Sequence, residues 1–129
     1  MAPILAVNKQ WPMVKKVVVV GPESTGKSEL CQQLARDFRT EWVPEFARFY
    51  IDRLDRPYEQ ADLLAIAQGQ LAWEDDKEAH SRKFLFCDTN LIVIKVWSEH
   101  SYGYTDPWVL DSLNARPYDF YLLADIDLP

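Results

Sequence analysis

Lys16-Val17-Val18-Val19-Val20-Gly21-Pro22-Glu23-Ser24-Thr25-Gly26-Lys27-Ser28 is the stretch that decides the fold of this chain. The β-branched run 16–20 is typical of a strand that is buried on both faces of a parallel sheet. The octapeptide 21–28 then fits G-x-x-x-x-G-K-[ST] at every fixed position. From Gly26 to about Phe38 the apolar residues recur at helical spacing. A glycine-rich turn between a strand and a helix predicts a loop that binds the phosphates of a nucleotide triphosphate.

The residues of this motif have separate expected roles. Backbone N–H groups of the loop surround the phosphates, and Lys27 reaches the β and γ phosphates. The Ser28 hydroxyl can bind the accompanying magnesium ion, so the expected cofactors are ATP and Mg²⁺. A plain glycine turn is the alternative, and the strand before the loop and the helix after it disfavour that alternative. The candidate nucleotide-binding residues are Gly21, Pro22, Glu23, Ser24, Thr25, Gly26, Lys27 and Ser28.

Composition limits the class of protein. With 129 residues, 48% of them apolar, the chain is expected to form one domain, at 16–129, after a leader at 1–15. A net charge of −6 argues against nucleic acid as a partner. Since no stretch reaches 18 apolar residues and no signal pattern is present, we expect a cytoplasmic protein without membrane contact. Cys31 and Cys87 are expected to be buried free thiols.

The rest of the chain alternates strand and helix patterns. This alternation predicts an α/β fold, namely the three-layer P-loop NTPase fold, with about four parallel strands flanked by helices. The fourth-strand pattern ends near Ala124, five residues before the chain stops. Beyond the first strand and helix, strands are expected at 40–43, 83–88 and 118–124, helices at 45–50, 58–80, 91–100 and 108–114, and a loop at 101–107.

Local features of the helices give further expectations. Pro57 suits the first turn of the long helix 58–80, and the charge cluster 74–78 at its end is interpreted as a solvated face. Gln68 and Gln70 offer amide hydrogen bonds near Trp73, which either packs in the core or offers a ring for stacking. The remaining aromatic and histidine side chains are expected in ordinary core or solvated positions: Trp42, Trp97 and Trp108 in the core, His80 and His100 in solvent or at helix caps.

Three further side chains are candidates for chemistry. Asp88 ends an apolar strand and is interpreted as a carboxylate for Mg²⁺, with a helix N-cap at Asp88-Thr89-Asn90 as the alternative. Glu45 and Arg48 follow the second strand, at the edge where parallel α/β sheets bind ligands. Glu45 can take a proton from a substrate hydroxyl, and Arg48 can hold a phosphate. The alternatives are a favourable helix start for Glu45 and a surface ion pair for Arg48.

These motifs together resemble one known family. The loop 21–28, Glu45-Phe46-Ala47-Arg48, Cys87-Asp88-Thr89 and the stretch 122–129 are similar to the ribosylnicotinamide kinase domain of the NadR family, also described as an AAA-type P-loop ATPase domain. The resemblance implies ATP-dependent phosphorylation of the 5′-hydroxyl of nicotinamide riboside in NAD biosynthesis, with Glu45 or Asp88 near that hydroxyl. In the family the pattern continues into a lid and a further strand, which we expect to be missing here. The family also implies an aromatic residue where Pro44 stands.

Two hypotheses follow from the sequence. The first is a small-molecule kinase in which Lys27, Glu45, Arg48 and Asp88 are the catalytic candidates and Ser28 and Asp88 hold Mg²⁺. Its partner is a small nucleoside. The second is an ATP-binding regulatory module, or an inactive kinase fragment, that binds nucleotide without turnover. A GTPase is disfavoured because no [NT]-K-x-D motif follows the loop.

Overall fold

A computed structural model describes residues 13–22 and 26–124 of the chain. Within these residues the elements, in chain order, are β1 (Lys15–Val20), α2 (Lys27–Phe38), β2 (Trp42–Val43), α3 (Phe46–Asp52), α4 (Gln60–Ala79), β3 (Phe84–Asp88), α5 (Leu91–Tyr102), α6 (Pro107–Ala115) and β4 (Phe120–Leu123). The four strands form one parallel sheet in the order β2-β3-β1-β4. The strand and helix order expected from the sequence is therefore confirmed.

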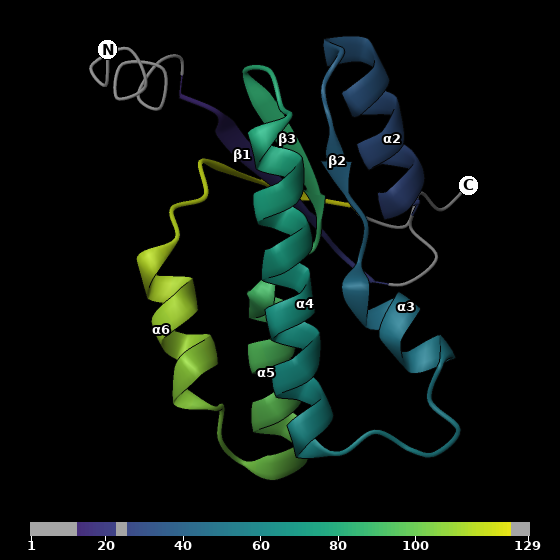
Figure 1. Ribbon diagram of the computed structural model, residues 1–129, viewed down its shortest axis with the longest axis vertical. Coiled ribbons are helices and arrows are strands. Elements are labelled where there is room, and N and C mark those ends of the chain that lie inside the picture. Colours follow the sequence, from purple (N-terminus) through teal and green to yellow (C-terminus); the bar gives the residue numbers. More distant parts are fainter. Residues whose placement is uncertain (1–12, 23–25, 125–129) are drawn as a thin grey trace, which may run out of the picture.

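Helices cover both faces of the sheet, which gives three layers (Figure 1). Because neighbouring side chains of a strand point to opposite faces, Val17 and Val19 pack with Cys31 and Ala35 of α2. Val18 lies on the other face and packs with Val43, Leu85 and Cys87, with Trp73 of α4 against them. The expected α/β fold, a P-loop NTPase sheet between helical layers, is confirmed.

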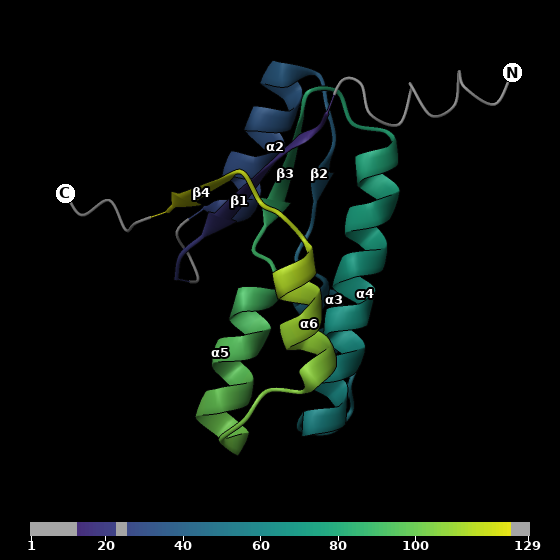
Figure 2. The same ribbon diagram turned by 90° about the vertical axis from the view of Figure 1, so that its left-hand side faces the viewer.

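The second part of the core lies beyond the carboxyl end of the sheet. Figure 2 shows α5 and α6 extending past the sheet beside the first half of α4. Residues from α3, α4, α5 and α6 form its buried cluster: Ala47, Leu63, Ile66, Ala67, Leu71, Leu91, Ile94 and Val109. These helices bring the start of α3 close to the ends of the strands, where a ligand site is expected.

Several boundaries differ from those expected. Helix α4 begins at Gln60, so Pro57 precedes it, because Glu59 and Asp62 form a capping box that fixes the start. Helix α5 continues to Tyr102 and ends at Gly103, whose φ of 80° suits glycine. Pro107, expected in a loop, is the first residue of α6. Trp108 was expected in the core and is instead exposed.

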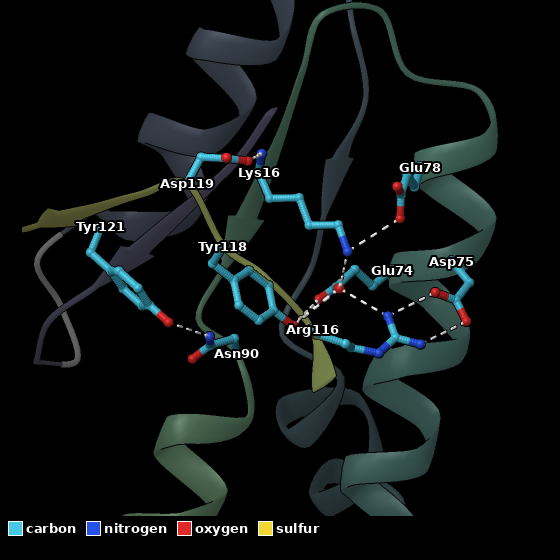
Figure 3. Close-up of polar contacts among 9 residues, drawn as sticks. All are labelled: Lys16, Glu74, Asp75, Glu78, Asn90, Arg116, Tyr118, Asp119 and Tyr121. Carbon is cyan, nitrogen blue, oxygen red and sulfur yellow. Dashed lines mark hydrogen bonds and ion pairs between the residues drawn. The ribbon is translucent and has the colours of Figure 1, made fainter. Parts of the chain in front are cut away.

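The interpretation of 74–78 as a solvated face is wrong for its first residue. Glu74 is fully buried. Lys16 Nζ donates to its Oε2 at 3.0 Å, and Arg116 and Tyr118 donate to the same carboxylate (Figure 3). Arg116 also binds Asp75 through two hydrogen bonds. Two cations from distant segments neutralise this carboxylate, a pairing that local charge density cannot reveal.

This cluster of Lys16, Glu74, Arg116 and Tyr118, here called the amino-edge network, lies at the amino end of β1. Burial lowers the pKa of Lys16, but the attraction of Glu74 and Glu78 outweighs that effect and raises it overall. Burial and the neighbouring Glu74 carboxylate raise the pKa of Tyr118. The network therefore joins α4, β1 and the segment before β4 through buried charges.

Both cysteines are buried free thiols, as expected. Burial raises the pKa of Cys31 to about 12, and the nearby Asp88 carboxylate adds to the effect. A thiol with such a pKa stays protonated at neutral pH and is therefore a poor nucleophile. Both thiols act as small apolar side chains on opposite faces of the sheet.

Candidate functional site

The structure describes residues 21–22 and 26–28 of the motif 21–28. Gly21 has φ of +150°, and a side chain there would collide with the carbonyl oxygen of Ala124 at the end of β4. Gly26 has φ of +80° and is the N-cap of α2. Both positions need the conformational freedom of glycine. The candidates Glu23, Ser24 and Thr25 lie outside the described residues.

Lys27 lies at the first position of α2 and is buried. Its Nζ donates to the carbonyl oxygens of Gly21 at 3.0 Å and Pro22 at 3.3 Å. The ammonium group is therefore held against the beginning of the loop. An anion bound by the loop would offer this cation a stronger, charge-assisted partner than the neutral carbonyls.

Ser28 and Asp88 meet although they are 60 residues apart in the sequence. Ser28 Oγ donates to Asp88 Oδ2 at 2.6 Å. The carboxylate is buried at the end of β3, which neighbours β1 in the sheet. The tripeptide Asp88-Thr89-Asn90 does include the N-cap of α5, but the cap is Asn90, whose side chain accepts from the amide of Ile92, rather than Asp88. A hydroxyl and a carboxylate are oxygen ligands of the kind that Mg²⁺ takes.

Glu45 lies between β2 and α3 and faces the same edge of the sheet. Thr89 Oγ1 donates to Glu45 Oε2 at 3.4 Å. Thr89 directly follows Asp88, is buried, and has φ of +66°. A positive φ is costly for a β-branched residue, and such strain gathers at functional sites. This residue links the end of β3 to Glu45.

An open groove runs from Ser28 along α3. Its volume is about 360 Å³, near the lower end of the range of small-molecule sites. Carboxylates, guanidinium groups and rings line it together: Ser28, Pro44, Glu45, Arg48, Phe49, Asp52, Arg53 and Trp73. The structure thus places Glu45 and Arg48 beside the phosphate-loop helix, on the side where the sequence predicts an acceptor.

Trp73 combines the two roles that the sequence left open. It packs edge-on against Phe46, with ring centroids 4.7 Å apart, and also lines the groove. Phe49 lies on the same wall, and the Arg53 guanidinium carbon stands 3.7 Å from the centre of its ring. The groove therefore has one aromatic wall and several charged groups of both signs.

Sequence reasoning did not single out Thr89, Asp52 or Arg53 as site residues. Thr89 had an available signal, since it follows the strand-end Asp88 directly. Asp52 and Arg53 gave no signal in the sequence, because the C-terminal end of α3 lines the groove only through the packing of α3 on α4. Gln70 was noted for its amide, and its buried contacts with the backbone around Glu45 come from tertiary structure alone.

Comparisons with known proteins show the family and the fold of the chain. A family model described as AAA domain matches residues 16–129, and the chain belongs to this family. The trifunctional NAD biosynthesis/regulator protein NadR of Salmonella typhimurium is 26% identical over 122 residues, which is 90% of this chain. The chain spans only 29% of the length of that relative.

Solved structures show the same fold. A NadR protein in complex with NR matches with a TM-score of 0.76 and 24% identity, over 85% of this chain and 33% of that one. A NadR protein in complex with NAD and AMP-PNP matches with a TM-score of 0.68 over 85% of this chain and 34% of the other, also at 24% identity. Thymidylate kinase from Ehrlichia chaffeensis matches with a TM-score of 0.54 and 15% identity, over 88% of this chain and 72% of that kinase. The fold is thus that of P-loop kinases, and the resemblance to NadR is confirmed.

Proposed function

We propose that this chain is an ATP-dependent kinase of a small nucleoside, with the 5′-hydroxyl of nicotinamide riboside as the acceptor. One observation carries the proposal. The hydrogen bond between Ser28 and Asp88 lies at the start of a groove that also holds Glu45 and Arg48. The expected nucleotide and acceptor groups therefore share one edge of the sheet, as phosphoryl transfer between two bound substrates requires.

Each residue has a defined task in this proposal. The loop amides and Lys27 bind the triphosphate, and Ser28 and Asp88 would hold Mg²⁺. The ion, when bound, supplies positive charge that neutralises the phosphate oxygens. Glu45 accepts a hydrogen bond from the acceptor hydroxyl and takes its proton as that oxygen bonds to the γ-phosphorus and the bond from this phosphorus to the oxygen of the leaving ADP breaks. Arg48 is placed along the groove to bind the transferred phosphoryl group.

The proposed acceptor rests on two supports. The first is the similarity to NadR, whose solved structures contain NR in one case and NAD with AMP-PNP in the other. The second is the groove itself, whose aromatic wall suits a planar ring and whose charged groups of both signs can bind the polar groups of a nucleoside. The proposed role belongs to NAD biosynthesis in the cytoplasm. Among the described residues, no helix combines the length and the apolar composition needed to cross a bilayer.

The test is a turnover assay with the purified chain, Mg-ATP and nicotinamide riboside, in which the mononucleotide and ADP are separated by chromatography. We expect stoichiometric formation of both products. Glu45→Ala is expected to lower kcat by about 10²–10⁴-fold, the usual contribution of a general base, while the affinity for ATP stays within about twofold of wild type. Glu41→Ala removes a carboxylate from the other end of β2 and is the matched control.

Two results would contradict the proposal in different ways. Binding of Mg-ATP without product from any nucleoside would identify an ATP-binding module that does not catalyse transfer. Product from thymidine or deoxyadenosine but not from nicotinamide riboside would keep the kinase and overturn its acceptor.

A further inference from the structure

Glu45 occupies the N-cap position of α3 without acting as its cap. Its backbone is extended, with φ of −75° and ψ of 109°, and its side chain makes no capping hydrogen bond to the helix. The first amides of a helix need partners from outside the helix. A side chain at the N-cap usually supplies one. Here the Glu45 carboxylate accepts from Thr89 Oγ1 instead, and the first amide of α3 is bound by a group from another helix.

Gln70 supplies that group from α4. Phe46 N donates to Gln70 Oε1 at 2.8 Å, and Gln70 Nε2 donates to the carbonyl oxygen of Pro44 at 3.4 Å. One side-chain amide therefore binds the peptide groups on both sides of Glu45. The backbone at Glu45 is thereby held by a side chain from α4, while Glu45 itself lines the groove.

The support behind Gln70 is rigid. Its side chain is only 4% exposed, and α4 contributes much of the buried helical cluster. One residue earlier, Gly69 leaves the space that the Phe46 ring occupies, since a side chain there would overlap that ring. One turn later, Trp73 packs against the same ring. The turn that holds Glu45 is thus fixed to α4 by hydrogen bonds and by close packing together.

We infer that Gln70 is a positioning residue, which fixes Glu45 against the acceptor hydroxyl by binding the backbone on both sides of it. The inference rests on the kinase function proposed above. Gln70 itself touches no reacting atom in this scheme. Without it, Phe46 N–H and Pro44 C=O lose their buried partner. The Glu45 carboxylate is then free to turn back and cap α3.

The variant that tests this is Gln70→Met, which keeps the length of the side chain and removes both hydrogen bonds. Gln68→Met is the matched control, because Gln68 is exposed on the same helix. We expect Gln70→Met to lower kcat about 10–100-fold, the scale of a small misplacement of a catalytic group, with the KM for ATP unchanged. Hydrogen exchange of the Phe46 amide should become at least about tenfold faster as its hydrogen bond is lost. Gln68→Met should change neither quantity.

A double variant separates positioning from general loss of structure. If Gln70 acts through Glu45, then Gln70→Met causes no further loss of kcat in a Glu45→Ala background. An equal loss in both backgrounds, or a faster Phe46 amide without any change in kcat, would overturn the inference.

The exchange measurement does not depend on turnover. A wild-type chain with a protected Phe46 amide and no kinase activity would overturn the proposed function, and with it the catalytic purpose of the contact. If the wild-type chain is active and the Phe46 amide exchanges at the same rate in wild type and in Gln70→Met, this inference alone is overturned.

Discussion

The two ends of the parallel sheet hold buried charges in different ways. At the amino end, Glu74 is surrounded by Lys16, Arg116 and Tyr118, which satisfy both oxygens of its carboxylate. At the carboxyl end, Lys27 and Asp88 are also buried, but Ser28, the hydrogen-bond partner of Asp88, lines an open groove. The first arrangement is closed and joins three segments. The second is open on one side and can exchange its contacts for those of a ligand.

Backbone strain is present at both ends of the sheet. Thr89, at the carboxyl end, has φ of +66°. At the amino end, Lys83 just before β3 has φ of 60° and Arg39 at the end of α2 has φ of 54°, but these strained residues lie outside the amino-edge network. Strain at a site costs stability and is kept where geometry serves function. The comparison therefore predicts that changes at the amino end alter mainly folding, and that changes at the carboxyl end alter mainly binding and turnover.

The largest expected effect is on stability, from Glu74→Gln. This change removes the shared carboxylate from Lys16, which is buried, and from Arg116, although Glu78 and Asp75 remain as partners, so the free energy of unfolding should fall by about 3 kcal/mol. Urea titration followed by circular dichroism measures it. Asp76→Asn, an exposed position on the same helix, should change it by less than about 0.5 kcal/mol. Equal effects of the two variants would show that the amino-edge network is not a structural junction.

Lys27→Ala is expected to lower the affinity for ATP more than it lowers stability. Removing the ammonium group should raise the Kd for Mg-ATP at least about 100-fold, or about 2.8 kcal/mol. The free energy of unfolding should change less than in Glu74→Gln, because the lost partners are carbonyl groups at the start of the loop. Calorimetric titration measures the Kd, and Lys95→Ala on α5 is the control. Unchanged affinity for ATP in Lys27→Ala would contradict the prediction that the motif 21–28 binds the phosphates of ATP.

The pH dependence of the amino-edge network provides a sharper comparison. The folded-state pKa of Tyr118 is raised, so its contribution to stability is fully present below the unfolded value near 10 and is lost as the pH rises above it. Tyr118→Phe should therefore cost about 1–2 kcal/mol at pH 8, through the lost hydrogen bond to Glu74. The difference from wild type should shrink above pH 10. Urea titrations at pH 8 and pH 10.5 test this, with Tyr104→Phe as an exposed control. A difference that grows with pH would contradict the assignment.

The smallest effect on stability is expected at Thr89. Thr89→Gly removes a buried side chain but also relieves a strained backbone, so the free energy of unfolding should change by less than about 1 kcal/mol. Turnover should fall nevertheless, because the contact with Glu45 is lost. Urea titration and the kinase assay on the same preparation give both quantities. A loss of 2 kcal/mol or more would mean that Thr89 serves folding rather than the site.

Much of the candidate site could be predicted because its signals are local. The octapeptide 21–28 is contiguous, and Asp88 follows an apolar strand directly, so pattern alone placed Ser28 and Asp88 at the same edge of a parallel sheet. Glu45 and Arg48 came from the same rule about strand ends. The structure brings Ser28 and Asp88 within 2.6 Å and places Glu45 and Arg48 along the adjoining groove. The roles proposed for these residues stay predictions.

Glu74 and Trp108 were misjudged because residue type and local sequence do not show which segments meet in the folded chain. Glu74 lies in a run of charged residues, and such runs usually face water. Its burial depends on Lys16 and Arg116, 58 and 42 residues away in the sequence. Trp108 was expected to be buried, since a large aromatic side chain usually packs inside, but it is exposed.

The sequence by itself determined the G-x-x-x-x-G-K-[ST] motif between the first strand and helix, the alternation of strands and helices, and the carboxylate at the end of β3. Each of these is encoded by neighbouring residues, whose spacing fixes backbone conformation and the direction of side chains. Only the tertiary structure decided the strand order β2-β3-β1-β4, the burial of Glu74 and the contact of Gln70 with the turn at Glu45. These features depend on which segments meet across the core, and such meetings follow from packing of the whole chain rather than from any local pattern.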